Sequence, residues 1–98
     1  MNIKELTKLM HKFVRSKGWY GTDSKRPQSP RNLSISLALE AAEILEHFQW
    51  NEDFEKKELA EELADVALYL LQLASIAEID LEKAILDKLE VNDSREWD

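Results

Sequence analysis

Apolar residues recur three and four positions apart along nearly the whole chain, which is the spacing of an α-helix. Breaks in this pattern predict four helices, over about 3–16, 30–49, 54–77 and 81–91. No stretch shows the strict alternation of apolar and polar residues that is typical of a half-buried strand. The length of 98 residues predicts one domain, over 1–98, so we expect a single all-α domain.

The ends of the predicted helices carry clear sequence signals. All glycines and prolines lie within 18–30, which predicts a loop between the first two helices. Ser29 is a favoured N-cap residue, and Pro30 suits the first helical position. Asp80 can cap the last helix in the same way, and the polar residues 51–53 mark the break between the second and third helices.

The third predicted helix is apolar on two sides. One stripe at helical spacing consists of Leu59, Leu63, Val66, Leu70 and Leu73. The other consists of Ala60, Ala64, Ala67, Leu68 and Leu71. A helix of this kind in a small domain is expected to be covered on both sides. We therefore predict a four-helix bundle completed by homo-oligomerisation, as a dimer or tetramer; the alternative is a compact monomeric bundle.

Two polar stripes run through the apolar segments of the second and third helices. The stripe on the second helix consists of Asn32, Ser36, Glu40, Glu43 and His47. The stripe on the third helix consists of Glu58, Glu62, Asp65, Tyr69 and Gln72. Because both stripes invade regions that otherwise look buried, we predict that the two helices face each other along them.

Each stripe contains a pair of carboxylates three positions apart, Glu40 with Glu43 and Glu62 with Asp65. Four carboxylates brought together would repel one another unless a cation compensates their charge. Oxygen ligands suit Mg²⁺ or Mn²⁺, so we expect these four residues to be metal ligands. Asp65 lies between Ala64 and Val66 and is expected to be the most deeply embedded of the acids.

Composition narrows the classes of function. The formal net charge of −7 makes the chain a poor general binder of nucleic-acid polymers. It contains no cysteine, which excludes disulfides and thiolate sites and fits a cytoplasmic protein. The N-terminus lacks the apolar core of a signal peptide, and no apolar run is long enough to cross a membrane, so we expect no membrane partner.

Two alternatives to this metal site remain. The acids could form an ordinary solvated helix face, because an isolated pair of this kind has little value as a motif. A di-iron bundle also uses carboxylates on paired helices, but it needs ExxH motifs. The residues three positions before His11 and His47 are Lys8 and Ile44, so neither histidine completes that motif.

Two long segments carry a resemblance to a known family. They read PRNLSISLALEAAEILEHFQW and EELADVALYLLQLASIAEIDLEKAILDKLEVNDSRE. Together they resemble the MazG-like all-α nucleoside triphosphate pyrophosphohydrolases, in particular the dCTP pyrophosphatase branch. The family pattern of ExxE, then ExxD, then a lysine and an asparagine matches the four acids, Lys88 and Asn92.

The resemblance implies Mg²⁺-dependent hydrolysis of a nucleoside triphosphate to the monophosphate and pyrophosphate. The cellular role that it implies is nucleotide-pool cleansing. It implies that Glu40 or Glu43 activates the attacking water. It also implies a set of substrate contacts consisting of Trp50, Tyr69, Lys88, Asn92 and Arg95.

The chain departs from that branch at two places, and one rival function stays open. Gln28 and Ser29 stand where the branch has a histidine before its PRN segment, and Arg95 stands near the arginine of the family pattern. Trp19 and Tyr20 either cover a nucleobase or cap the core. The rival is a non-catalytic acidic helical oligomer that acts as a regulatory or interaction module; an enzyme acting on another phosphorylated substrate is a weaker alternative.

Overall fold

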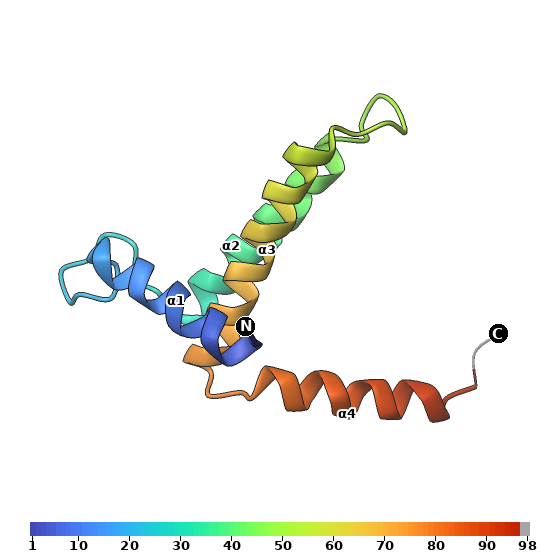
Figure 1. Ribbon diagram of the computed structural model, residues 1–98. Helices are drawn as coiled ribbons and strands as arrows, with labels where there is room; N and C mark the ends of the chain where they lie inside the picture. The colour runs from blue at the N-terminus through green and yellow to red at the C-terminus, as the bar shows by residue number, and fades with distance from the viewer. Residues whose placement is uncertain (97–98) are drawn as a thin grey trace.

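The computed structural model describes residues 1–96 and contains four α-helices (Figure 1). They are α1 (Ile3–Ser16), α2 (Pro30–Glu46), α3 (Lys56–Ile76) and α4 (Leu81–Ser94). Residues 1–96 form no strand, so the predicted all-α class is confirmed. None of the helices in this range has the length and apolar character that a membrane span requires.

Two predicted helix ends are displaced in the structure. The second helix ends at Glu46 rather than at 49, because the backbone N–H groups of His47 and Phe48 bond three residues back and tighten the chain into a turn. The fourth helix continues past 91 to Ser94. The sequence contains no glycine or proline there, and the Ser94 hydroxyl donates to the carbonyl of Glu90.

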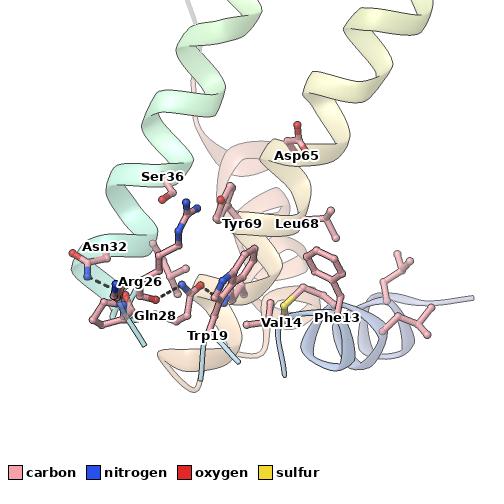
Figure 2. Close-up of a pocket in the computed structure, with 17 residues that line it drawn as sticks. Phe13, Val14, Trp19, Arg26, Gln28, Asn32, Ser36, Asp65, Leu68 and Tyr69 are labelled. Atoms are coloured by element: carbon pink, nitrogen blue, oxygen red, sulfur yellow. Dashed lines mark hydrogen bonds between the residues drawn. The ribbon is translucent and has the colours of Figure 1, made fainter. Parts of the chain in front are cut away.

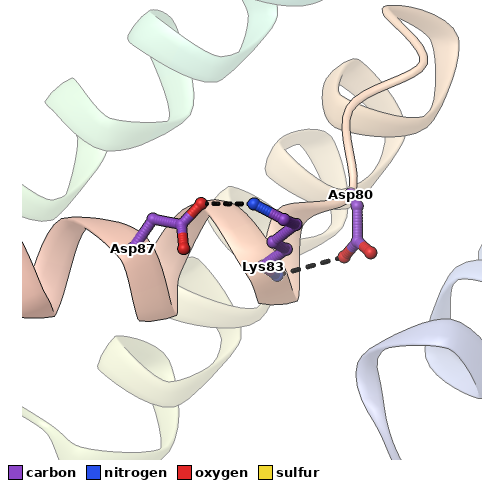
Figure 3. Close-up of polar contacts among 3 residues, drawn as sticks. All are labelled: Asp80, Lys83 and Asp87. Carbon is purple, nitrogen blue, oxygen red and sulfur yellow. Dashed lines mark hydrogen bonds and ion pairs between the residues drawn. The ribbon is translucent and has the colours of Figure 1, made fainter.

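Local interactions fix the starts of α2 and α4 as predicted. The Ser29 hydroxyl accepts from the backbone N–H of Asn32 at 3.2 Å. Asp80 accepts from the backbone N–H of Lys83 at 3.1 Å, and the Lys83 ammonium pairs with Asp87 at 2.7 Å (Figure 3). This ion pair is exposed and contributes only about 0.3–0.5 kcal/mol.

The end of α3 holds a residue in the left-handed conformation. Glu78 has φ 59°, and its N–H donates to the carbonyl of Ser75 while the N–H of Ile79 donates to that of Ala74. This is the Schellman arrangement, in which glycine is the favoured residue. Gly18 occupies the same position after α1 with φ 75°. Both helices therefore end in a left-handed residue, which is glycine after α1 and glutamate after α3.

The helices α2 and α3 form an antiparallel hairpin, and α1 packs across the hairpin near the start of α2 and the end of α3 (Figure 1). The turn at 47–55 lies at the far end of the hairpin. The last helix, α4, leaves the hairpin and extends away from it. One end of the hairpin is therefore covered by α1, while most of its remaining length is not covered by any other helix of residues 1–96.

The hydrophobic core is small and lies where α1, α2 and α3 meet. The buried apolar side chains within 1–96 are Met10, Val14, Leu33 and Ala74. The accessible surface is 8120 Å², whereas a compact monomer of this mass exposes about 5,800 Å². The radius of gyration is 16.0 Å, against about 13 Å for a compact domain of this length. One chain therefore does not close a bundle by itself.

Candidate functional site

The two acidic pairs meet between α2 and α3. Glu40 of α2 and Glu62 and Asp65 of α3 each place one carboxylate oxygen within 4.8 Å of the others. Glu43 lies one turn beyond Glu40 and close enough to Glu40 and Glu62 to raise the pKa of both. The antiparallel hairpin produces this arrangement, because it sets the polar stripe of one helix against that of the other.

The crowding changes the acidity of two of these groups. Burial raises the pKa of Glu40 above its usual value, and the charge and hydrogen bond of Glu43 and the charges of Asp65 and Glu62 raise it further. The hydrogen bond with Glu43 is the main cause of a raised pKa at Glu62, followed by burial and the charge of Glu43. The cluster therefore holds protons more strongly than isolated carboxylates do.

Asp65 differs from its sequence-based prediction. It is exposed, whereas Glu40 and Glu62 are half-buried, so the prediction that Asp65 is the most deeply embedded acid is wrong. Its apolar neighbours in sequence point in other directions around α3, and several of them are themselves uncovered. Apolar neighbours in sequence bury a helical residue only where another element packs over them.

The cluster has the donor chemistry of a hard-cation site. The Oε2 atoms of Glu40 and Glu62 are shielded from solvent and accept no hydrogen bond from the residues that the structure describes. Buried carboxylate oxygens in this state are costly, and a divalent cation would satisfy them. The residues present therefore fit a divalent cation such as Mg²⁺ or Mn²⁺.

A cavity of about 600 Å³ opens on one side of the cluster (Figure 2). Asp65 and Tyr69 of α3 and Ser36 of α2 line its acidic end. Apolar side chains of α1, including Phe13 and Val14, form another wall. The volume is within the range of small-molecule sites, and a few polar groups stand among apolar ones, as such sites require.

A second hollow lies on the other side of the cluster, toward the turn at 47–55. Glu43, His47, Glu58 and Glu62 line it together with residues of that turn. The two polar stripes thus continue into both hollows, as their spacing predicts. The first hollow combines apolar walls with isolated polar groups, whereas the second is strongly acidic, so only the first suits a nucleoside.

The loop at 17–29 supplies cavity residues that the sequence analysis did not single out as ligands. Lys25, Arg26 and Gln28 line the cavity with Trp19. The Arg26 guanidinium carbon lies 5.9 Å from the centre of the Trp19 ring, within cation–π range. Basic and aromatic residues are clustered in this loop although the chain as a whole is acidic, and this clustering could have indicated a ligand contact. The path of the loop in space could not be derived from it.

Trp19 and Tyr20, whose roles were left open, separate in the structure. Trp19 lines the cavity and packs edge-to-face on Phe13 with ring centres 5.8 Å apart. The Tyr20 hydroxyl bonds to His11 Nδ1 at 2.6 Å and accepts from Gln72 Nε2 at 3.2 Å. Tyr20 therefore ties the loop to α1 and α3, while Trp19 faces the candidate ligand space.

The other predicted substrate contacts lie apart from the cavity in a single chain. Trp50 is 86% exposed in the turn at the far end of the hairpin. Lys88 and Asn92 are on α4, and Arg95 follows that helix, so all three lie on the segment that extends away from the hairpin (Figure 1). Of the predicted contacts, the structure brings only Tyr69 to the cavity beside the acids.

Comparisons with known proteins agree with this architecture. The sequence profile of the MazG-like family matches residues 35–97. The dCTP pyrophosphatases 1 of Homo sapiens and Rattus norvegicus are 32% and 31% identical over 103 residues, covering 95% of this chain and 58% of theirs. This chain therefore spans a little over half the length of these relatives.

The similarity extends to a solved structure. The crystal structure of a pyrophosphatase from Archaeoglobus fulgidus matches with a TM-score of 0.78 and 36% sequence identity. The match covers 92% of this chain and 87% of that one. Sequence profile, relatives and fold agree, and they confirm the resemblance noted from the motifs: this chain belongs to the MazG-like family.

Proposed function

We propose that the protein is a nucleoside triphosphate pyrophosphohydrolase that converts a (d)NTP and water to the monophosphate and pyrophosphate. The observation that carries this proposal is the acidic cluster beside a cavity of nucleoside size, whose wall includes Asp65. Phosphates held at the cluster would place the base among Trp19 and its neighbours. The names of the relatives support the same class of reaction.

Glu40, Glu43, Glu62 and Asp65 would hold Mg²⁺, with Mn²⁺ as a possible substitute. When bound, the cation would neutralise phosphate oxygens and stabilise the charge that develops as the phosphoanhydride bond breaks. A scaffold protein has no need for shielded carboxylate oxygens without partners, which disfavours the non-catalytic alternative.

The chain's own residues would orient the substrate and the water. Glu43 or Glu40 would hold the attacking water and accept its proton, since both belong to the cluster. Tyr69, one turn beyond Asp65 and half-buried in the cavity wall, would donate its hydroxyl proton to a phosphate oxygen. A carboxylate cluster requires such donors, because the substrate is also anionic.

A homo-oligomer, dimer or tetramer, would complete the site. The large uncovered surface and the extended α4 support this proposal. In an assembly, Lys88, Asn92 and Arg95 of one copy would reach the phosphates at the acidic cluster of another. Trp50 would likewise contact a base held by a neighbouring copy. Their distance from the cavity within one chain then has a simple explanation.

The proposed setting is nucleotide-pool cleansing in the cytoplasm, with a preference close to dCTP. The names of the human and rat relatives specify dCTP, which supports this preference. The net charge of −7 opposes binding of nucleic-acid polymers, so a free nucleotide is the expected partner. Neither a polymer nor a membrane is needed for the proposed reaction.

The decisive experiment is a panel of canonical and modified dNTPs and NTPs incubated with the protein and Mg²⁺. Monophosphate and pyrophosphate should appear in equal amounts, and a chelator should stop the reaction. Release of inorganic phosphate, or no turnover of any nucleotide, would contradict the proposal. Glu40→Gln should abolish turnover, while the exposed Glu61→Gln on α3 should preserve it.

A further inference from the structure

Gln72 lies in the cavity wall, away from the acidic cluster. It is 3% exposed and is the only buried polar side chain within residues 1–96. Its position on α3 is seven residues beyond Asp65, which corresponds to roughly 10 Å along the helix axis. A nucleotide with its phosphates at the acids would therefore extend its base toward Gln72.

A relay of hydrogen bonds fixes the orientation of the Gln72 amide. The backbone carbonyl of Arg26 can only accept, so it fixes Gln28 Nε2 as its donor at 2.6 Å (Figure 2). Gln28 Oε1 is then the acceptor for Gln72 Nε2 at 2.8 Å. The second proton of Gln72 Nε2 goes to the Tyr20 oxygen at 3.2 Å. Both donors of this amide are thus used.

The remaining atom of the amide, Gln72 Oε1, has no hydrogen-bond partner in the described range 1–96. It differs from the orphaned oxygens of Glu40 and Glu62 because it is not sealed from contact. Gln72 is buried and lines the cavity, and its Nε2 is engaged by Gln28 and Tyr20, which leaves Oε1 as the amide atom available to a ligand there. A ligand in the cavity that carries a donor can therefore bind to this oxygen.

We propose that Gln72 Oε1 selects a nucleobase that carries an exocyclic amine, such as the 4-amino group of cytosine or the 6-amino group of adenine. Gln28 acts as a positioning residue, because it fixes which end of the Gln72 amide faces the base. This inference rests on the proposed function and adds the residue that sets base preference. No metal ligand takes part in the selection.

The physical basis is the difference between an amine and a carbonyl at one place on the base. An amine donates to Gln72 Oε1 and satisfies both groups. A carbonyl in the same position would set two acceptors against each other and leave both without a partner in a shielded site. The relay prevents Gln72 from rotating to offer its Nε2 instead. The expected discrimination is on the order of tenfold to a hundredfold in kcat/KM.

The first test changes the substrate and leaves the protein intact. The kcat/KM of wild-type protein is measured for dCTP, dUTP and a dCTP analogue without the 4-amino group, and for dATP and an analogue without the 6-amino group. Within the better series, removal of the amine should cost at least about tenfold. Equal values for amine and amine-free substrates would overturn the inference while leaving the pyrophosphohydrolase activity established.

The second test changes the acceptor and its relay. Gln72→Met preserves side-chain volume, and it should remove the preference for the amine while retaining turnover of the amine-free analogue. Gln28→Leu should weaken the preference, because the Gln72 amide can then rotate. The exposed Gln49→Met is the matched control and should leave the ratio unchanged.

The outcomes separate the two proposals. A Gln72→Met protein that melts like wild type and retains the amine preference would overturn the role of Gln72. If that variant does not fold, the substrate series and Gln28→Leu still decide the inference. Absence of hydrolysis of every nucleotide by the wild-type protein would instead overturn the proposed function, and this inference with it.

Discussion

Glu40 of α2 and Asp65 of α3 bring carboxylate oxygens within 4.8 Å of each other, together with an oxygen of Glu62. The hairpin holds these like charges together although their mutual repulsion opposes folding. The cluster is therefore expected to weaken the metal-free protein and to strengthen the metal-bound one. The opposite signs of these two effects give the site clear experimental signatures.

Asp65→Asn should separate the stability of the fold from the activity of the site. The variant removes one charge and keeps the side-chain shape, so the metal-free protein should hold or gain stability. Mg²⁺-dependent stabilisation and hydrolysis should both fall, with a loss of turnover on the order of a hundredfold or more. Melting curves with Mg²⁺ and with chelator, and a pyrophosphate assay, measure these effects.

The matched control for this variant is Glu61→Gln, which removes a charge from an exposed acid on the same helix. Its effect on stability should stay within about 0.5 kcal/mol, and its turnover should match wild type. Near-normal Mg²⁺-dependent turnover in Asp65→Asn would remove Asp65 from the proposed ligand set.

Acidification should stabilise the metal-free cluster. The pKa values of Glu40 and Glu62 lie above the ordinary 4.5. At pH values between 4.5 and the raised pKa values, the folded state therefore binds more protons than the unfolded state. The contribution of these groups to the free energy of unfolding therefore falls as pH rises through that window. The free energy of unfolding can be measured with urea in the presence of chelator at several pH values. As pH rises, it should fall less for Glu40→Gln than for wild type. Identical pH slopes would contradict the assignment.

His11 should have the opposite pH dependence. Burial is the main cause that lowers its pKa below 6.5, and the charge of Arg15 lowers it further. At pH values between the lowered pKa and 6.5, the unfolded state therefore binds more protons than the folded state. Stability from His11 is present above 6.5 and is lost as pH falls through its folded pKa. An NMR titration of the His11 ring should give a midpoint below 6.5, and His11→Gln should reduce the loss of stability in acid.

The hydrogen bonds of His11 explain why its neutral form is favoured. Since Gln72 donates to the Tyr20 oxygen, the Tyr20 hydroxyl can donate to His11 Nδ1. His11 Nε2 then carries the proton and donates to Ser75 Oγ at 2.7 Å. Protonation of Nδ1 would break the first of these bonds. A His11 midpoint at or above 6.5 would show that this network does not select the neutral ring.

The protein should self-associate through its uncovered apolar surface. Leu86 and Leu89 on α4 are 61% and 59% exposed, which is costly for a helix that remains in water. Light scattering at micromolar concentration should give a dimer or tetramer, and the melting temperature should rise with protein concentration. Leu89→Lys should dissociate the assembly and reduce turnover, whereas Lys83→Ala on the same helix should do neither. A stable wild-type monomer would contradict the oligomer.

Glu78→Gly should stabilise the protein despite removing a side chain. Glu78 adopts φ 59°, and a non-glycine residue in this region costs about 1 kcal/mol. Glycine would relieve that cost and keep the two capping hydrogen bonds at the end of α3. Glu78→Ala removes the same charge but keeps the strain, so the free energy of unfolding should be higher for the glycine variant. Equal stability of the two variants would show that the strain is absent.

Features that depend on neighbours along the chain could be predicted from the residue pattern. Apolar spacing gave the four helices, and Ser29 and Asp80 gave two of their starts, because caps act on N–H groups only a few residues away. The two polar stripes gave the helix faces that carry the acids. The motifs also indicated the family, since its pattern is written in residues at fixed spacing.

Which groups are shielded, and what surrounds them, depends on how the helices pack. The exposure of Asp65 depends on which helices pack over α3, and the cavity depends on the path of the loop that carries Arg26 and Gln28. The free oxygen of Gln72 follows from a chain of hydrogen bonds between residues far apart in sequence. Burial and amide orientation are set by contacts across space, and these exist only once the helices have packed.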